Sequence, residues 1–278
     1  METSYTILEP DRQNRPTYWK IAKNLQQVDY LETSPYLDSV TEDTINGKYE
    51  LDEAIKKIDV HYFDARYSAY SASSSHLAGT EEADKVAVRI VHFLERRAFG
   101  RTPAVLKSIH RELFSGILKS EWVGSYRKVN LTKKEPVLNG KSVQYADYPM
   151  IEEALRYDFE MQRNVHYYLP FDPKQIEAMA RFTSNIWQTH PFREGNTRTI
   201  AVFTIARLIH MGVDFNSEPF ENHARFFRDA LVRASYSSLS NSIEEDLSFL
   251  IKFFENVLIS AKHDLSSLDL RCPQLFGL

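Results

Sequence analysis

The chain has 278 residues, of which 43% are hydrophobic and 13% aromatic, so it is long and apolar enough to bury a core. A formal net charge of −4 without a long basic run disfavours general nucleic-acid binding, which needs a basic face. Only 9 Gly and 11 Pro argue against a turn-rich β architecture, and the single cysteine, Cys272, excludes an intrachain disulfide.

The sequence lacks the apolar segments that direct a chain into or across a membrane. No charged segment followed by an apolar one opens the chain at Met1. The longest apolar stretch, residues 200–209, is too short to span a bilayer and contains Arg207. A single cysteine suits a reducing compartment. We therefore expect a soluble, cytoplasmic protein with no membrane partner.

The first hundred residues predict helices that are interrupted by prolines and by a serine run. Pro10, Pro16 and Pro35 break any long helix in the first forty residues. Apolar residues recur at helical spacing on both sides of residues 71–80. That stretch is a serine run followed by glycine, a composition typical of a turn.

The middle of the chain predicts a helix and then a hairpin. Apolar residues share one helical face over residues 103–118. Residues 135–145 predict a short β-hairpin, because the Asn139-Gly140 pair tolerates the positive φ angles of a type I′ turn. No other stretch predicts a convincing hairpin.

The C-terminal half predicts five helices, of which the third is apolar nearly all round. The predicted helices cover residues 151–164, 174–189, 197–211, 222–236 and 244–260. So little polar face on residues 197–211 is typical of the buried centre of a bundle. The fold class expected is therefore all-α, a helical bundle with one small β-hairpin.

The segment from His190 to Arg198 joins two predicted helices and combines groups suited to phosphate chemistry. Gly195 gives the backbone freedom, and Asn196 can cap the next helix. The first free N–H groups of that helix form an anion site that the helix dipole favours. Arg193 adds positive charge beside it, as does Arg198.

Two residues of this segment can serve as a metal ligand and a base. Glu194 would repel a bare anion but fits if a divalent cation lies between carboxylate and phosphates. His190 can take a proton near neutral pH, although a lone histidine could equally be structural. No second histidine stands at a zinc-like spacing, so hydrolytic zinc chemistry fits poorly. Together the groups indicate phosphoryl or nucleotidyl transfer.

The segment resembles the signature of the Fic family, His-x-Phe-x-(Asp/Glu)-Gly-Asn-x-Arg, and every defining position from His190 to Arg198 matches. The stretch Gly124-Ser125-Tyr126-Arg127 is similar to the family's segment leading into a hairpin flap, and residues 135–145 stand where that flap belongs. The resemblance covers roughly residues 100–255.

This resemblance implies a protein adenylyltransferase that moves AMP from ATP to a Tyr, Thr or Ser hydroxyl of a target protein, with modification of the chain itself and a homodimer left open. His190 would be the general base, and Glu194 would hold Mg²⁺ on the phosphates. Phe192 would anchor the loop. The nucleotide would be bound by Arg193, Gly195, Asn196, Thr197, Arg198 and Phe227.

The resemblance also implies a flap and three regions. The flap would hold the target by strand addition through Val137, Leu138, Asn139 and Gly140. The regions would be an N-terminal helical region at 1–98 and a catalytic core with flap at 99–215. C-terminal helices at 216–278 would pack on that core.

Two departures from the family pattern affect the nucleotide. Many members carry a second arginine three residues after the first, where this chain has Ala201. The absence of this arginine would weaken the contact with the γ-phosphate of ATP and could permit a different nucleotide as donor. A Tyr-Tyr pair that often lines the base pocket is matched here by Phe226-Phe227, which could also be plain core.

A third departure affects regulation. Many members silence themselves with a helix bearing (Ser/Thr)-x-x-x-Glu-(Gly/Asn), and Ser74 and Gly79 match its ends while Ala78 replaces the glutamate. Either the brake is lost naturally or the chain is a Glu→Ala variant. The functional alternatives are UMP or phosphocholine transfer, removal of AMP, and a non-catalytic nucleotide-binding regulator.

Overall fold

The computed structural model describes residues 9–68, 74–97, 99–266 and 268–277. The α-helices in these ranges are α1 (Arg15–Asn24), α2 (Pro35–Ile45), α3 (Leu51–Ser68), α4 (Ser74–Glu95), α5 (Ala104–Phe114), α6 (Ile151–Arg163), α7 (Pro173–Thr189), α8 (Asn196–His210), α9 (Glu218–Asn222), α10 (Ala224–Ala234), α11 (Ser248–Ile259) and α12 (Pro273–Phe276). Short 3₁₀ helices are η1 (Arg12–Asn14), η2 (Leu25–Asp29), η3 (Pro136–Leu138), η4 (Tyr148–Met150) and η5 (Leu239–Asn241). Over these ranges no sheet forms, which confirms the all-α class, and no helix has the length and apolar composition needed to cross a membrane.

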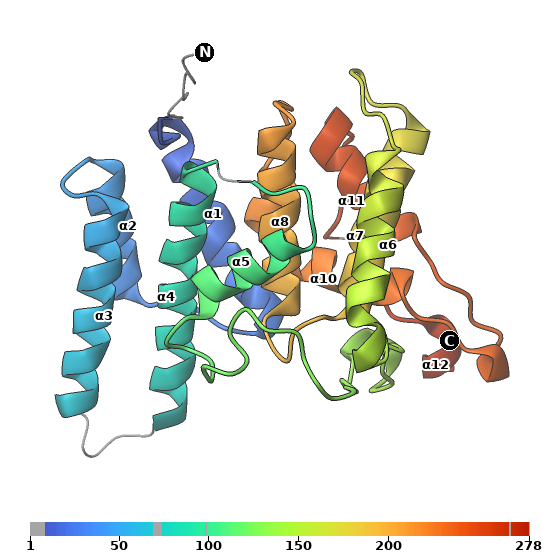
Figure 1. Ribbon diagram of the computed structural model, residues 1–278, viewed down its shortest axis with the longest axis horizontal. Coiled ribbons are helices and arrows are strands. Elements are labelled where there is room, and N and C mark those ends of the chain that lie inside the picture. The colour runs from blue at the N-terminus through green and yellow to red at the C-terminus, as the bar shows by residue number, and fades with distance from the viewer. Residues whose placement is uncertain (1–8, 69–73, 98, 267, 278) are drawn as a thin grey trace, which may run out of the picture.

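Helix α8 lies in the middle of the bundle (Figure 1). It packs against α4, α5 and α7. In the view of Figure 1 the helices α2, α3 and α4 lie to its left and α6 and α7 to its right. All its residues except Arg207, Ile209 and His210 are buried. The expectation that residues 197–211 form the buried centre is therefore confirmed.

Prolines begin two of the N-terminal helices. Pro16 stands in the first turn of α1, and Pro35 is the first residue of α2. A first-turn N–H has no intrahelical acceptor, so a proline costs no hydrogen bond there. Ser34 caps α2 by accepting a hydrogen bond from Leu37 N. The prolines thus set where these short helices start.

The serine run contributes to a helix instead of forming the whole of a turn. Residues 71–73 lie outside the described ranges, whereas residues 74–80 form the first turns of α4. The turn prediction is wrong for residues 74–80. Farther along α4, Val86, Ala87 and Ile90 are completely buried, and the helix packs on α1 and α3. Packing of that apolar face outweighs the weak helix propensity of serine.

The hairpin prediction is correct about the turn and wrong about the strands. Asn139 and Gly140 both have positive φ, 51° and 79°, as the prediction required. Residues 136–138 instead form the 3₁₀ helix η3. Pro136 has no N–H to donate to a ladder, and Val137 O accepts from Cys272 N at 2.9 Å. The carbonyl of Val137 is therefore bonded to the C-terminal segment and not to a second strand of the hairpin.

Candidate active site

A cavity of 160 Å³ opens at the N-terminal end of α8. It is lined by Asp29, Leu131, Thr132, Lys133, Tyr145, His190, Arg193, Glu194, Gly195, Asn196 and Thr197. The loop between α7 and α8 supplies the middle of this wall, and segments far away in sequence supply the rest. The segment singled out from the sequence thus faces a cavity.

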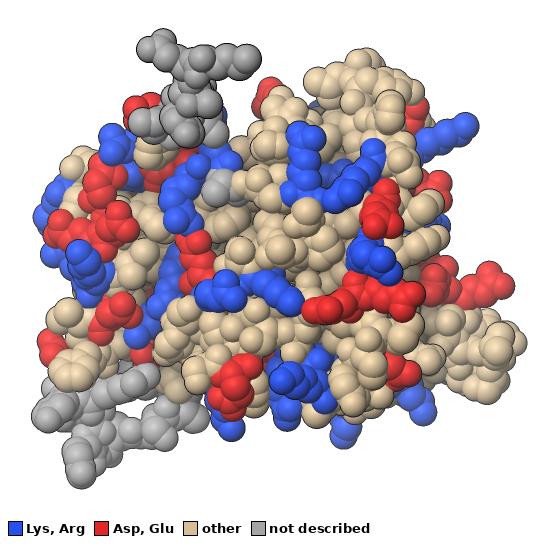
Figure 2. Space-filling view, viewed as in Figure 1, with Lys and Arg blue, Asp and Glu red and all other residues tan. Residues whose placement is uncertain are grey.

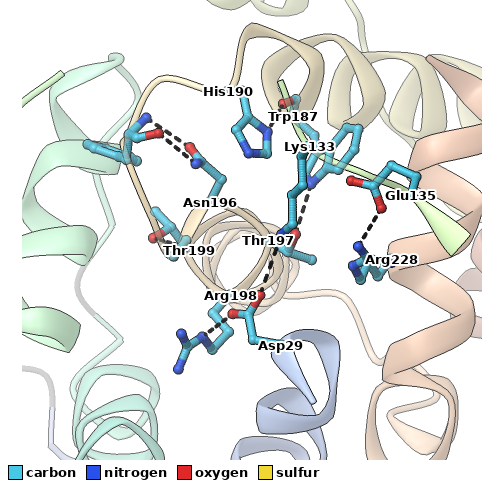
Figure 3. A network of polar contacts seen from close by, with 12 residues as sticks. Asp29, Lys133, Glu135, Trp187, His190, Asn196, Thr197, Arg198, Thr199 and Arg228 are labelled. Atoms are coloured by element: carbon cyan, nitrogen blue, oxygen red, sulfur yellow. Dashed lines mark hydrogen bonds and ion pairs between the residues drawn. The ribbon is translucent and has the colours of Figure 1, made fainter. Parts of the chain in front are cut away.

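The geometry of His190 leaves one ring nitrogen able to accept a proton. His190 ends α7 with a positive φ of 46°. Its Nδ1 lies 3.3 Å from Trp187 O. A carbonyl only accepts, so this contact places the proton on Nδ1 and the lone pair on Nε2. Figure 3 shows the ring above the start of α8, near Lys133.

Tyr145 holds the other face of the imidazole. The rings of Tyr145 and His190 are stacked with centroids 4.1 Å apart. The Tyr145 hydroxyl donates to Glu135 Oε1 at 3.3 Å, and Glu135 pairs with Arg228 (Figure 3). A buried ion pair therefore fixes the ring that packs on the candidate base.

Burial keeps His190 neutral. The residue is 5% exposed. Desolvation, assisted by the positive charge of Lys133, lowers the pKa of His190 to about 3. The side chain is therefore unprotonated at neutral pH, the form that a general base needs. Negative charge in the cavity would raise this pKa because it stabilises the imidazolium.

Gly195 occupies a position that no other residue fits. Its φ is 71°, in the left-handed region, and a Cβ would lie 2.4 Å from the Phe114 ring. Its carbonyl accepts from Thr199 N at 3.0 Å and from Thr199 Oγ1 at 2.9 Å. The loop therefore turns into α8 with its backbone pressed against Phe114.

Asn196 fixes the loop with its side chain. Asn196 Oδ1 accepts from Phe192 N at 2.9 Å, and Asn196 Nδ2 donates to Phe192 O at 2.8 Å. Phe192 is completely buried, in agreement with its expected anchoring role. The first N–H groups of a helix lack intrahelical acceptors. Asn196 and Thr197 belong to the first turn of α8 and line the cavity, so this end of the helix suits an anion.

Glu194 and Arg193 stand at the mouth of the cavity. Both side chains are exposed, and the Arg193 guanidinium lies 4.9 Å from the centre of the Trp122 ring. Partial desolvation, together with the carboxylates of Asp29 and Glu82, raises the pKa of Glu194. A cation beside Glu194 would relieve this crowding of carboxylates.

The site offers no closed cage for a metal ion. Among the described residues no group of three or more His, Cys, Asp or Glu side chains is arranged to hold one. Mg²⁺ commonly binds through one or two carboxylates together with substrate phosphates and water. A lone carboxylate beside an anion site fits that mode of binding.

Arg198 is turned toward the N-terminal part of the chain. Its Nη2 donates to Glu82 Oε1 at 2.6 Å, its Nη1 donates to Gln26 Oε1 at 3.1 Å, and its Nε lies 2.8 Å from Asp29 Oδ2. Figure 3 shows it on the far side of α8 from His190. Arg198 does not line the cavity, so it contacts no phosphate there in this conformation.

Residues 101–208 match the model of the Fic/DOC family. The chain carries a Fic/DOC domain. The matched segment runs from just before α5 to near the end of α8 and includes the whole loop from His190 to Gly195. No curated protein matches the chain. The resemblance drawn from residues 190–198 is thereby confirmed at the level of the family.

Phe227 was expected to stack on a base, and its burial contradicts that expectation. Phe227 is 0% exposed and packs against Phe220 and Phe253, with ring centroids 5.6 and 5.0 Å away. A fully enclosed ring has no face for a ligand. Ala201 is also completely buried in α8.

The residues expected to regulate the Fic/DOC domain lie near the start of α4. Ser74 is the first residue of α4, Ala78 is exposed, and Gly79 has room for a Cβ, 3.5 Å from Leu31. Glu82 follows Ala78 by one helical turn. Glu82 is the residue of α4 whose carboxylate accepts a hydrogen bond from Arg198 of α8.

The expected flap positions do not line the cavity of the Fic/DOC domain. Val137 and Leu138 are buried, and Asn139 Nδ2 donates to Leu275 O at 2.9 Å. Gly140 follows in the same turn. A target could add to this backbone only if the C-terminal segment made room, because Val137 O is already bonded to Cys272 N.

Two supporting residues were not identified from the sequence. His110 accepts from Gly124 N at 3.0 Å through Nδ1, so its Nε2 donates to Glu194 O at 3.1 Å. Arg127 donates to His190 O at 2.8 Å and to other backbone carbonyls. Both side chains hold main-chain atoms of the loop between α7 and α8. In the sequence, Arg127 stood out only as a member of the Gly124–Arg127 stretch, and His110, which precedes that stretch, did not stand out.

Proposed function

We propose that the chain transfers AMP from ATP to a hydroxyl group of a target protein. The observation that carries the proposal is the shared cavity, where the unprotonated Nε2 of His190 and the N-terminus of α8 meet. The match to the Fic/DOC family supports the same class of reaction. ATP as donor and the buried free thiol of Cys272 suit a cytoplasmic location.

In the proposed reaction the target hydroxyl oxygen attacks the α-phosphorus of ATP. A bond forms between that oxygen and phosphorus as the bond to the β-phosphate oxygen breaks, and pyrophosphate leaves. The hydroxyl proton passes to His190 Nε2. Phosphate charge in the cavity raises the proton affinity of the imidazole. The base is thus strengthened only when the nucleotide is present.

The backbone start of α8 and two side chains would orient the nucleotide. The N–H groups of the first turn would donate to phosphate oxygens, and Lys133, which also lines the cavity, would add positive charge. Glu194 would hold a magnesium ion, which neutralises developing charge on the phosphates when bound. His110 would keep Glu194 in place through the Glu194 carbonyl.

A neighbouring groove is our candidate for the target segment. It has a volume of 410 Å³ and shares Tyr145 with the cavity. Its walls carry amide, hydroxyl and carboxyl groups that can bind an extended backbone. The lining residues are Gln144, Tyr145, Ala146, Asp147, Asp158, Asn185, Gln188, Thr189, Ser235 and Ser237. A hydroxyl arriving along this groove would pass the Tyr145 ring toward His190.

The proposal is tested by incubating the purified chain with Mg²⁺, ATP and a protein extract, and measuring added AMP by mass spectrometry. His190→Ala should lower labelling by about 100- to 10,000-fold, because general-base catalysis is lost. His166→Ala, an exposed histidine far from the loop in sequence, is the matched control. Undiminished labelling by His190→Ala would exclude the mechanism.

The identity of the donor is tested in the same assay. Ala201 leaves no arginine at the second position of the family pattern, and its complete burial leaves no room for one. UTP, GTP and CDP-choline are therefore tested as donors in parallel with ATP. A mass increase equal to UMP or phosphocholine would mean that the chain uses a donor other than ATP for the transfer. Nucleotide binding without any transfer would favour a non-catalytic regulator.

A further inference from the structure

A second cavity lies at the opposite end of α8 from His190. Its volume is 440 Å³, and α8 contributes Phe203, Arg207 and His210 to its wall. A helix of 15 residues is about 22 Å long. Since the first cavity opens at Asn196, the two sites are separated by most of the helix and share no lining residue.

The floor of this second cavity is aromatic. Phe159 of α6, Phe182 of α7 and Phe203 of α8 are buried there, and their ring centroids lie 5.3 to 6.1 Å apart. Phe99 and Tyr167 extend the apolar wall toward solvent. Cavities of this size with an apolar floor and a few polar groups are typical of small-molecule sites.

The rim of the second cavity is basic. Arg101, Arg163, Arg207 and His210 line it, and no aspartate or glutamate is among its lining residues. Figure 2 shows Lys and Arg side chains gathered over the upper ends of α6 and α8, in the orientation of Figure 1. The cavity thus combines an apolar interior with a positive entrance.

Arg207 links the floor to the rim. Its guanidinium lies 5.2 Å from the Tyr167 ring centre and 5.0 Å from that of Phe182. Its Nη1 is buried and has no hydrogen-bond partner among the described residues. Desolvation lowers the pKa of Arg207, and the group that opposes this shift is the Tyr167 hydroxyl, not a carboxylate. A buried unsatisfied donor of a charged group is costly, and a bound anion would satisfy it.

Arg101 and His210 face each other at the entrance. Arg101 Nη2 lies 3.3 Å from His210 Nε2, and the His210 ring stacks on Phe99 with centroids 5.0 Å apart. Because the guanidinium can only donate, His210 Nε2 is the acceptor in this contact. The other donors of Arg101 and those of Arg163 stay available to a ligand.

We propose that this cavity binds a small amphipathic anion, a carboxylate attached to an aromatic or aliphatic body. The carboxylate would accept from Arg207 and a rim arginine, and the body would lie against Phe159 and Phe203. Planar guanidinium groups suit a carboxylate because they can donate two parallel hydrogen bonds. The volume accommodates a bicyclic aromatic acid.

Isothermal titration calorimetry with 2-naphthoate and decanoate tests the site. The neutral isostere 2-naphthamide should bind at least about tenfold more weakly than 2-naphthoate, because it lacks the charge that Arg207 and the rim arginines recognise. Arg207→Met keeps the aliphatic stem and should weaken 2-naphthoate by about tenfold or more. Arg156→Met changes an exposed arginine of α6 outside the cavity and should bind like the original chain.

Two outcomes would overturn the assignment. The first is equal binding of 2-naphthoate and 2-naphthamide, or no binding of either, by the unchanged chain. The second is a folded Arg207→Met variant, shown by its thermal unfolding, that binds 2-naphthoate undiminished. Arg163→Gln, at an exposed position, gives the same comparison without altering the buried part of the site.

Discussion

Gly195 is the residue at which the loop between α7 and α8 tolerates least change. Gly195→Ala should destabilise the chain by about 1–2 kcal/mol for the left-handed backbone, and overpacking against Phe114 should add about 1–3 kcal/mol. Displacing Phe114 would also shift the start of α8 and lower transfer. Urea unfolding and the labelling assay measure the two effects.

Gly47 provides the matched control for Gly195. It has the same φ of 71°, but a Cβ there would meet nothing within 4 Å. Gly47→Ala should therefore lose only the backbone contribution and keep its activity. If both variants lost equal stability, the contact with Phe114 would have no energetic role.

The loop residues that line the cavity could be predicted because they are contiguous in sequence. His190, Glu194 and Gly195 fall within six positions, and the geometry of a loop entering a helix brings them to one cavity. His110 and Arg127 could not be identified in this way. Both act on backbone carbonyls far away in sequence, and backbone groups leave no mark in a sequence pattern.

The same limit explains Arg198. Its position in the signature predicted a phosphate contact, and its partners, Asp29 and Glu82, lie more than a hundred residues away in sequence. Side-chain direction then depends on which carboxylates the fold brings near. Sequence spacing contains no information about that competition.

At the scale of elements, α4 and η2 hold Arg198 away from the cavity. We expect Glu82→Gln to strengthen nucleotide binding and raise transfer several-fold, because the guanidinium would lose a charged partner and could turn toward phosphate. Ala78→Glu should have the opposite effect. It adds a carboxylate one turn earlier on the same face of α4. Nucleotide affinity by calorimetry and labelling rate are the measurements.

The control for Glu82 is Glu53→Gln. Glu53 is an exposed residue of α3 that pairs with Lys57 on its own helix. This variant should match the original chain in affinity and rate. Equal affinities for the Glu82→Gln variant and the original chain would mean that Arg198 does not limit nucleotide binding.

Helices were predicted best where apolar periodicity was strong, and worst where local composition competed with packing. α6, α7 and α8 begin and end within one residue of the predicted bounds. The predictions for the serines at the start of α4 and for the Asn139-Gly140 turn used only the neighbouring residues in the sequence. Long-range contacts decided both, through the buried face of α4 and the bond from Cys272 to Val137.

At the scale of the molecule, one hydrophobic cluster joins the N-terminal helices to the Fic/DOC domain. Its members run from Tyr18 in α1 to Cys272 near the C-terminus. The match at 101–208 lies inside the catalytic core proposed at 99–215. The division into 1–98, 99–215 and 216–278 remains a prediction. Residues from the first region nevertheless contact Arg198, so we expect that region to influence the site.

Stability of the whole chain should fall in mild acid, partly because of His110. Burial lowers the pKa of His110 to about 4, whereas an exposed histidine has a pKa near 6.5. Between these values the unfolded chain binds a proton that the folded chain does not. The free energy of unfolding therefore decreases as pH falls through this range, by up to about 1.4 kcal/mol per pH unit.

His110→Gln isolates this contribution from that of every other titrating group. The variant should be less stable than the original chain at pH 7, because bonds to Gly124 N and Glu194 O are altered. The difference in free energy of unfolding between the original chain and the variant should decrease from pH 6.5 toward pH 4, since glutamine takes up no proton. Urea unfolding at half-unit steps measures this difference, and His166→Gln should keep the slope of the original chain. If this difference did not depend on pH, the fold would not hold His110 neutral, and the bond from His110 to Glu194 O would survive protonation.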